Sequence, residues 1–429
     1  LHLRPMSFET PTLLFALALL GSLALRLWLV TRQMRHVAAH RGTVPAAFAA
    51  RVSLSAHQRA ADYTLAKGRH AIAALALGSV VMLAWTLLGG LEALNTLVRD
   101  AVLPHWGAMA YQLALLSAFT LIGTLVDLPL ELWSTFGIEQ RHGFNRVTPA
   151  LFVADMAKSA LLGAAIGLPL AALILWIMAH SGGLWWLWAW GAWAAFNLVL
   201  MVVYPIWIAP WFNRFEPLAD AALADRVRAL MQRCGFSAKG LFVMDGSRRS
   251  AHGNAYFAGL GAAKRVVFYD TLLAKLEPVE VEAVLAHELG HFRHRHVLQR
   301  IVLMLGLSLV ALGILGWLAG RAGFYTALGV QPNLGAPNDA LALLLFGMVV
   351  PLVGSFVSPV LAQLSRRHEF QADAYACAQA DGRALASALL KLHEDNAATL
   401  TPDPVYARFT YSHPPAAQRL AALPAPAGG

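Results

Sequence analysis

Seven apolar runs alternate with polar stretches along the chain, and each run is long enough to cross a bilayer as a helix. A membrane-spanning helix needs about 20 consecutive, mostly apolar residues. The third run contains two acids, Asp127 and Glu131, which we expect to face protein or water, or, for Glu131, to lie at the membrane surface. The pattern predicts an all-α polytopic membrane protein with seven transmembrane helices at residues 11–30, 71–97, 107–136, 151–179, 184–211, 298–320 and 340–364.

Residues 212–297 form the one sizeable polar insert between two spans. The stretch 218–236 predicts an amphipathic helix that stops at Gly235. A second helix is expected to begin at Glu277-Pro278. Between them, runs rich in β-branched and aromatic residues predict short strands at 240–244, 254–260 and 265–270.

The chain is therefore expected to have four parts. Spans one to five and their loops lie in 1–211, and a small α+β insert fills 212–297. Spans six and seven lie in 298–364, and a helical C-terminal segment follows in 365–429.

The composition agrees with a membrane protein, because only 13% of the residues are charged and 58% are hydrophobic, whereas soluble domains carry about 25% charged residues. The net charge of +9 does not indicate nucleic acid, since the basic residues lie mainly in loops beside the spans, where they set topology. The 31–70 loop is strongly basic, with Asp62 its only acid, and the positive-inside rule places it in the cytoplasm. Alternation then puts the N-terminus outside and both the insert and the C-terminal segment inside.

The sequence LAHELGHFRHRH (285–296) contains a candidate zinc site. His287 and His291 are four residues apart, so on a helix they project from one face and can bind one Zn²⁺ together. Glu288 lies beside the first histidine, where it can take a proton from the attacking water. The alternative is an interfacial helix end whose histidines and arginines face water and lipid headgroups.

A catalytic zinc usually takes three protein ligands, and Glu369 is the candidate for the third. Two spans separate it from His291, so the chain crosses the membrane and returns, and both residues lie near the same membrane border. Asp373, one turn after Glu369, is expected to orient a ligating histidine. Three other histidines are not expected to be ligands: His368, which should point elsewhere, and His294 and His296, which should be solvated.

Five motifs in order resemble the Ste24-type CaaX prenyl proteases, integral membrane zinc metallopeptidases of the M48 family. They are IEQRHGFNRVT (138–148), GNAYFAG (253–259), HELGH (287–291), SRRHEFQAD (365–373) and YSHPP (411–415). The resemblance implies a seven-helix barrel around an intramembrane chamber, with one Zn²⁺ facing into it. It assigns the ligands to His287, His291 and Glu369, and the general base to Glu288.

The resemblance also implies how a substrate is held. Asn254, Ala255 and Tyr256 match an edge strand that pairs with the substrate backbone, a recognition mode in which main-chain hydrogen bonds hold the peptide extended. His413 and Arg419 match positions that contact the substrate or the developing oxyanion. The HGFN stretch (142–145) matches a family signature for which we expect only a packing role.

The expected reaction is hydrolysis of CaaX-type or other membrane-associated peptides, and the expected partners are a peptide or lipidated peptide and membrane lipids. The Ala-, Leu- and Trp-rich composition suggests a high-GC bacterium, and therefore an inner membrane. Three alternatives are a heat-shock-type quality-control zinc protease, which usually has fewer spans, a site-2-type protease, whose LDG motif is replaced here by LVDLPL, and a seven-helix transporter with incidental histidines.

Overall fold

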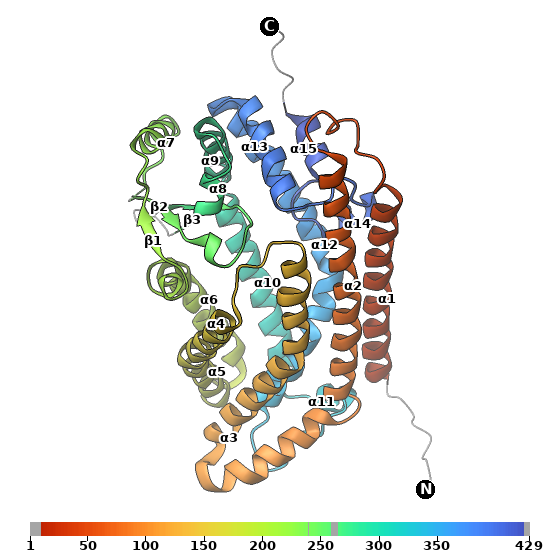
Figure 1. The fold of residues 1–429 in the computed structure, drawn as a ribbon. Coiled ribbons are helices and arrows are strands. Elements are labelled where there is room, and N and C mark those ends of the chain that lie inside the picture. The colour runs from red at the N-terminus through yellow and green to blue at the C-terminus, as the bar shows by residue number, and fades with distance from the viewer. Residues whose placement is uncertain (1–9, 239, 259–264, 424–429) are drawn as a thin grey trace.

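Seven long helices stand side by side, with a small sheet and most of the short helices toward one end (Figure 1). This computed structural model describes residues 10–238, 240–258 and 265–423. Within those ranges, seven helices are long and apolar enough to cross a membrane. The predicted fold class, seven transmembrane helices with a small α+β insert, is confirmed.

The seven spans are built from the longest helices. The first is α1 (Thr10–Ala39), the second α2 (Leu54–Trp85), and the third α3 (Gly90–Leu132) with a π-helical turn Trp133–Glu139. The fourth joins α4 (Pro149–Leu162) to α5 (Leu168–His180) through a π-helical turn, and the fifth is α6 (Trp185–Val203) with further turns to Trp211. The sixth and seventh are α10 (His296–Leu318) and α12 (Asp339–Gln379).

The prediction of a second span over 71–97 is wrong in its second half. The helix α2 ends at Trp85, and α3 begins at Gly90. Gly89 has a φ of +80°, a conformation that ends a helix and that L side chains rarely adopt. At Gly90 a Cβ would lie 2.5 Å from the carbonyl oxygen of Ala84. The apolar run is continuous, but these two glycines turn the chain.

The predicted third span, 107–136, begins at the kink of α3 and leaves out the helical segment that precedes it. The helix α3 starts at Gly90 and kinks at Gly107, where φ is +78°. The chain therefore forms a helical segment before the kink and the span itself after it, as the bent orange helix at the lower end of Figure 1 shows.

A four-stranded sheet forms the middle of the insert, with strand order β1-β2-β4-β3. The strands are β1 (Phe215–Pro217), β2 (Gly240–Met244), β3 (Ala255–Ala258) and β4 (Arg265–Tyr269). The central pair β2 and β4 is parallel, and the outer strands are antiparallel to their neighbours. The strand predicted at 254–260 thus begins one residue later, and its last two residues lie outside the described ranges. β3 is an edge strand.

The insert and the C-terminal helices share one hydrophobic core. It joins α7 (Ala221–Arg233), β2, β4, α8 (Asp270–Leu273) and α9 (Pro278–Arg293) to α13 (Gly382–Asp395). Val227, Val266 and Phe268 are fully buried in it, and Leu385 and Ala388 contribute from α13. The remaining short helices are α11 (Ala322–Ala327), α14 (Pro404–Thr410) and α15 (Ala416–Ala422).

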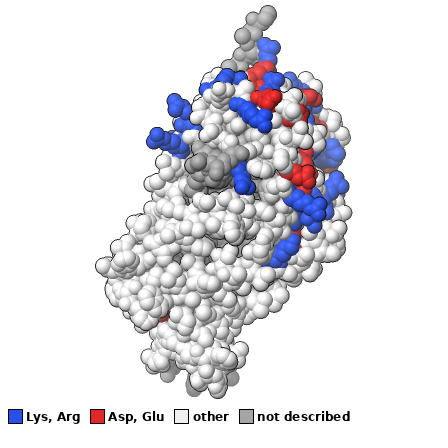
Figure 2. Space-filling model, turned by 90° about the vertical axis from the view of Figure 1, so that its left-hand side faces the viewer, with Lys and Arg blue, Asp and Glu red and all other residues white. Residues whose placement is uncertain are grey.

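Charged side chains concentrate at the end of the molecule that carries the insert and the C-terminal helices. Figure 2 shows Lys, Arg, Asp and Glu over this upper end, whereas the lower part of the visible face is almost free of them. An apolar body with one charged end is the surface expected of a protein whose helices cross a bilayer.

The helix α9 packs closely along α12, and Gly290 permits the approach. A Cβ on Gly290 would lie 2.9 Å from the Cα and 3.1 Å from the carbonyl oxygen of Ala372. Neither contact can be relieved by rotating a side chain, because both partner atoms are backbone. The glycine of HELGH therefore has a packing role.

Gly290→Ala is expected to destabilise the fold by about 1–3 kcal/mol, the usual cost of overpacking a tight contact. Thermal unfolding in detergent measures this as a lower Tm. Gly306→Ala on α10 is the matched control, since a Cβ there meets nothing within 4 Å. Equal Tm values for the two variants would contradict the close approach.

Candidate active site

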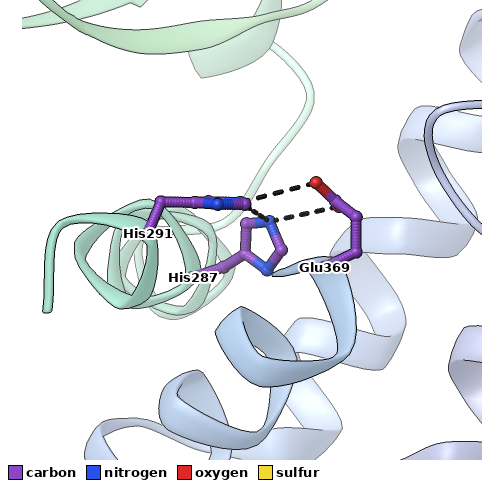
Figure 3. A group of neighbouring side chains, drawn as sticks. All are labelled: His287, His291 and Glu369. Atoms are coloured by element: carbon purple, nitrogen blue, oxygen red, sulfur yellow. Dashed lines mark hydrogen bonds and ion pairs between the residues drawn. The ribbon is translucent and has the colours of Figure 1, made fainter. Parts of the chain in front are cut away.

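Two imidazoles from α9 and one carboxylate from α12 converge on a single point (Figure 3). The Nε2 atoms of His287 and His291 are 3.2 Å apart. The carboxylate of Glu369 lies 3.6 Å from the first of these nitrogens and 3.5 Å from the second. Ligands bound tetrahedrally to zinc at its usual bond lengths are about 3.3 Å from one another. The two approaches of Glu369 are made by different oxygens, Oε2 and Oε1, and one donor atom from each residue lies within 4.8 Å of the others, so the group could hold such an ion.

Glu369 itself indicates that a cation belongs here. Its side chain is buried, and its Oε2 is among the few buried side-chain atoms of the described residues with no hydrogen-bond partner. A buried carboxylate oxygen without a hydrogen-bond donor is costly unless a cation compensates it, and the Arg419 guanidinium that approaches it at 3.4 Å is shared with Asp373. Two imidazole nitrogens and a carboxylate oxygen form a donor set that suits Zn²⁺.

Both histidines direct an unprotonated Nε2 to this point, because other residues occupy their Nδ1 atoms. Nδ1 of His287 is 2.8 Å from Asp373 Oδ1 and must donate to it. Nδ1 of His291 is 3.1 Å from Nδ1 of His296, whose Nε2 lies 2.8 Å from Gln371 Oε1. Since an amide oxygen only accepts, His296 donates to Gln371 and accepts from His291. Both Nε2 lone pairs remain available.

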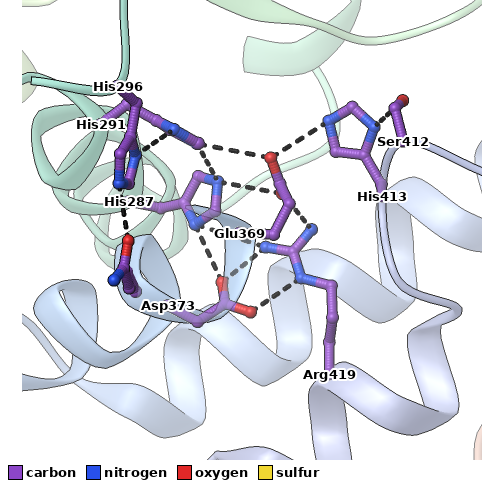
Figure 4. A network of polar contacts seen from close by, with 9 residues as sticks. His287, His291, His296, Glu369, Asp373, Ser412, His413 and Arg419 are labelled. Atoms are coloured by element: carbon purple, nitrogen blue, oxygen red, sulfur yellow. Dashed lines mark hydrogen bonds and ion pairs between the residues drawn. The ribbon is translucent and has the colours of Figure 1, made fainter. Parts of the chain in front are cut away.

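Asp373 is in turn held by Arg419 (Figure 4). The Arg419 guanidinium donates to both carboxylate oxygens of Asp373, at 2.8 and 2.5 Å. Its Nη1 is 3.4 Å from Glu369 Oε2. Arg419, which was expected at the substrate, is buried and has most of its donors committed to these two carboxylates.

Glu288 lines the same cavity as His287 and His291. Burial raises the pKa of its carboxyl, which brings it toward the range where a general base works well at neutral pH. Burial, with the charge of His287 as the next cause, lowers the pKa of His291 to about 3. His291 is therefore neutral, as a metal ligand must be.

The cavity measures about 570 Å³ and is also lined by residues at β3 and in the loop between α14 and α15. Asn254, Ala255 and Tyr256 line it from β3. His413 enters from the loop between α14 and α15, with its Nε2 3.3 Å from Glu369 Oε1 and its Nδ1 3.0 Å from Ser412 Oγ. The His413 side chain is 66% exposed, so it is free to meet a bound molecule.

Sequence reasoning missed the contribution of His296. The expectation that it is solvated is wrong, because it is only 4% exposed and lies between His291 and Gln371. Its ring also stacks on His368, with centroids 3.9 Å apart. Among the described residues, the only metal-competent group is the one formed by His287, His291 and Glu369, so none of His294, His296 and His368 joins it.

Comparisons with known proteins agree along the whole chain. Residues 33–214 match the family described as CAAX prenyl protease N-terminal, five membrane helices, and residues 217–427 match peptidase family M48. A CAAX prenyl protease 1 homolog of Oryza sativa is 34% identical over 91% of this chain and 92% of its own. The human homolog is 33% identical over 71% of each chain.

The fold has an equally full counterpart. The crystal structure of Ste24p from S. mikatae superposes with a TM-score of 0.91 at 28% identity, covering 97% of this chain and 100% of that one. The first family description specifies five membrane helices, in agreement with the helices of this chain that are long and apolar enough to cross a membrane. The chain therefore belongs to the CAAX prenyl protease family of M48 peptidases and is a multi-pass membrane protein.

Proposed function

We propose that the protein is a zinc metalloendopeptidase that hydrolyses membrane-associated peptides, with one Zn²⁺ held by His287, His291 and Glu369. The observation that supports this most directly is the convergence of three donor atoms beside Glu288, in a cavity bordered by an edge strand. Family membership favours this function over the transporter and site-2-type alternatives.

A bound Zn²⁺ supplies Lewis-acid polarisation of the scissile carbonyl. Glu288 takes the proton of the attacking water and passes it to the leaving amine. His413 lies across Glu369 from α9 and can donate to the oxygen on which negative charge develops (Figure 4). Losing one such donor typically lowers turnover about 100- to 1,000-fold.

Asp373 and Arg419 have a positioning role in this scheme. Asp373 accepts a hydrogen bond from Nδ1 of His287 and so fixes the His287 ring. The Arg419 guanidinium donates to the same carboxylate and holds it in place. Outer partners of this kind set the tautomer and orientation of a ligating histidine. The contacts of Arg419 support this role better than direct contact with substrate.

The substrate is expected to add to the outer edge of β3, which has no partner strand among the described residues. This strand pairs with β4 on one side, and Asn254, Ala255 and Tyr256 face the cavity. An unpaired edge holds an extended peptide by main-chain hydrogen bonds, and so tolerates varied side chains. A CaaX-type peptide, the substrate class in the relatives' name CAAX prenyl protease 1 homolog, fits such a site.

Product analysis tests the function and its specificity. The purified enzyme is incubated with one CaaX peptide in prenylated and unprenylated forms, and the products are identified by mass spectrometry. Preferred cleavage of the prenylated form supports CaaX specificity, equal cleavage indicates a general membrane peptidase, and no cleavage of either refutes the peptidase proposal.

We also propose that the charged end carrying the metal group faces the cytoplasm, in a bacterial inner membrane with the N-terminus outside. The basic 31–70 loop supports this side, and it is joined to the C-terminal helices by the ion pair of Arg32 with Asp403 at 2.9 Å. Labelling of an Ala47→Cys variant by an impermeant maleimide only after lysis would support the orientation. Labelling of intact cells would reverse it.

His296→Phe is expected to weaken zinc binding about 10- to 100-fold, as loss of an outer partner usually does. Phenylalanine preserves the stack on His368 but cannot accept the hydrogen bond of His291. Competition with a chelating dye measures the affinity. His294→Phe is the control, since His294 also stacks on His296 but is not hydrogen-bonded to His287, His291 or Glu369 in any contact of the described residues. Unchanged affinity in His296→Phe would contradict the role.

A further inference from the structure

Each residue of the HGFN stretch (142–145) has a specific structural role, which follows from the contacts of the loop between the third and fourth spans. Nδ1 of His142 lies 2.9 Å from the carbonyl oxygen of Ile138 at the end of the helix. Gly143 has a φ of +82°, which only glycine adopts readily. The Asn145 side chain accepts from the Val147 amide at 2.7 Å and donates to Gln140 at 2.8 Å, which fixes the turn.

This loop pairs through its backbone with the segment that leads into the edge strand β3. Asn145 and Ser250 form an antiparallel bridge. On one side of it the Arg146 amide donates to the Arg249 carbonyl, and on the other the Ala251 amide donates to the Phe144 carbonyl, each at 3.2 Å. The loop therefore acts as a short strand against residues 249–251.

The ring of Phe144 continues the contact by stacking on His252. Their centroids are 4.5 Å apart and the planes are inclined by 21°. His252 directly precedes Gly253 and Asn254, the first residues of this segment that line the cavity. The carbonyl of Asn254 accepts from the Tyr269 amide at 3.0 Å and so starts the pairing of β3 with β4. Phe144 therefore helps to fix the position of the residues at the start of β3, through its contact with His252.

The other partners of His252 come from opposite sides of the protein. Its Nδ1 lies 3.0 Å from Asn396 Oδ1 at the end of α13, and its Nε2 lies 3.8 Å from Glu139 Oε2. Tyr63 of α2 donates to Glu139 Oε1 at 2.5 Å and packs on Phe144, with ring centroids 4.9 Å apart. Tyr63 of the second span and Glu139 at the end of the third are thus connected to His252, three residues before β3.

We propose that the HGFN loop is the positioning element of the substrate-binding strand, acting through Phe144 and His252 to hold β3 at the distance from the metal group that peptide pairing requires. The inference rests on the proposed peptidase function and deepens it. Phe144 is a positioning residue in this scheme, since it does not line the cavity. Its removal should weaken strand pairing with the peptide and leave the metal donors, which lie on α9 and α12, in place.

The experiment uses a cleavable peptide whose backbone amides are N-methylated one at a time. In the wild-type enzyme, methylation of an amide that pairs with β3 is expected to lower kcat/KM at least about fivefold, the worth of one main-chain hydrogen bond. In Phe144→Ala the same methylation is expected to cost less than about twofold, because the pairing is already lost. The zinc content should match the wild type, and Phe144→Tyr, which keeps the ring, should restore the wild-type penalty.

The control is Phe324→Ala, an equal truncation on α11 at the opposite end of the helices (Figure 1), which should retain the full methylation penalty. If Phe144→Ala does not fold, Phe144→Leu is used in the same comparison. A full penalty in the Phe144 variant overturns the proposal, as does a wild-type enzyme that cleaves the peptide without sensitivity at any amide. A wild-type enzyme that cleaves nothing would instead refute the peptidase function itself.

Discussion

Glu288→Gln is expected to lower kcat about 10²- to 10⁴-fold, the usual contribution of a positioned general base. The amide has the size of the carboxylate but cannot take a proton from water. Glu288 is not one of the three donors that converge on the metal position, so zinc content should remain at one per chain. Turnover of a fluorogenic peptide and elemental analysis of the same sample measure the two quantities together.

The control for this variant is Glu282→Gln on the same helix. The Glu282 carboxylate pairs with Arg226 and Arg233, on the side of α9 that faces α7, and it does not line the catalytic cavity. Its variant should keep nearly full turnover. If the Glu288→Gln variant retained wild-type turnover, Glu288 would not be the general base, whatever the zinc content of that variant.

Glu369→Ala is expected to remove the metal, and with it all activity. The loss takes away one of three donors, so affinity should fall by more than the 10- to 100-fold typical of an outer partner. The change also removes the negative charge that Arg419 approaches at 3.4 Å, which leaves the guanidinium charge less compensated beside a cation site. Zinc per chain after dialysis against a mild chelator gives the readout.

Asp339→Asn is the matched control, because Asp339 is an acid at the other end of the same helix, α12. It should retain zinc under identical dialysis. Stoichiometric zinc in Glu369→Ala would mean that another residue completes the coordination, and the assignment of the third ligand would be wrong.

The proximity of His287, His291 and Glu369 could be predicted from sequence because each part of the arrangement depends on a local or topological rule. The spacing of His287 and His291 needs only the helical period. Glu369 follows from counting two crossings of the membrane between it and His291. The structure places all three donor atoms within 4.8 Å of one another.

Other features depend on contacts that no local pattern encodes. His296 was expected in solvent because it follows an Arg- and His-rich stretch, yet Gln371, from the seventh span, makes it a partner of His291. The break after Trp85 was missed since hydropathy does not register the φ of Gly89. The stacking of Phe144 on His252 brings the HGFN stretch into contact with the residues just before GNAYFAG. The resemblance of each motif to a family could not show that contact.

The order in which the active site is completed during synthesis follows from the core that the insert shares with α13. His287 leaves the ribosome 86 residues before Asp373 and 132 residues before Arg419. The helix α9 also lacks the part of its packing surface that Leu385 and Ala388 contribute until those residues emerge. A nascent chain therefore carries the HELGH helix well before the carboxylate and guanidinium that surround His287 have been synthesised.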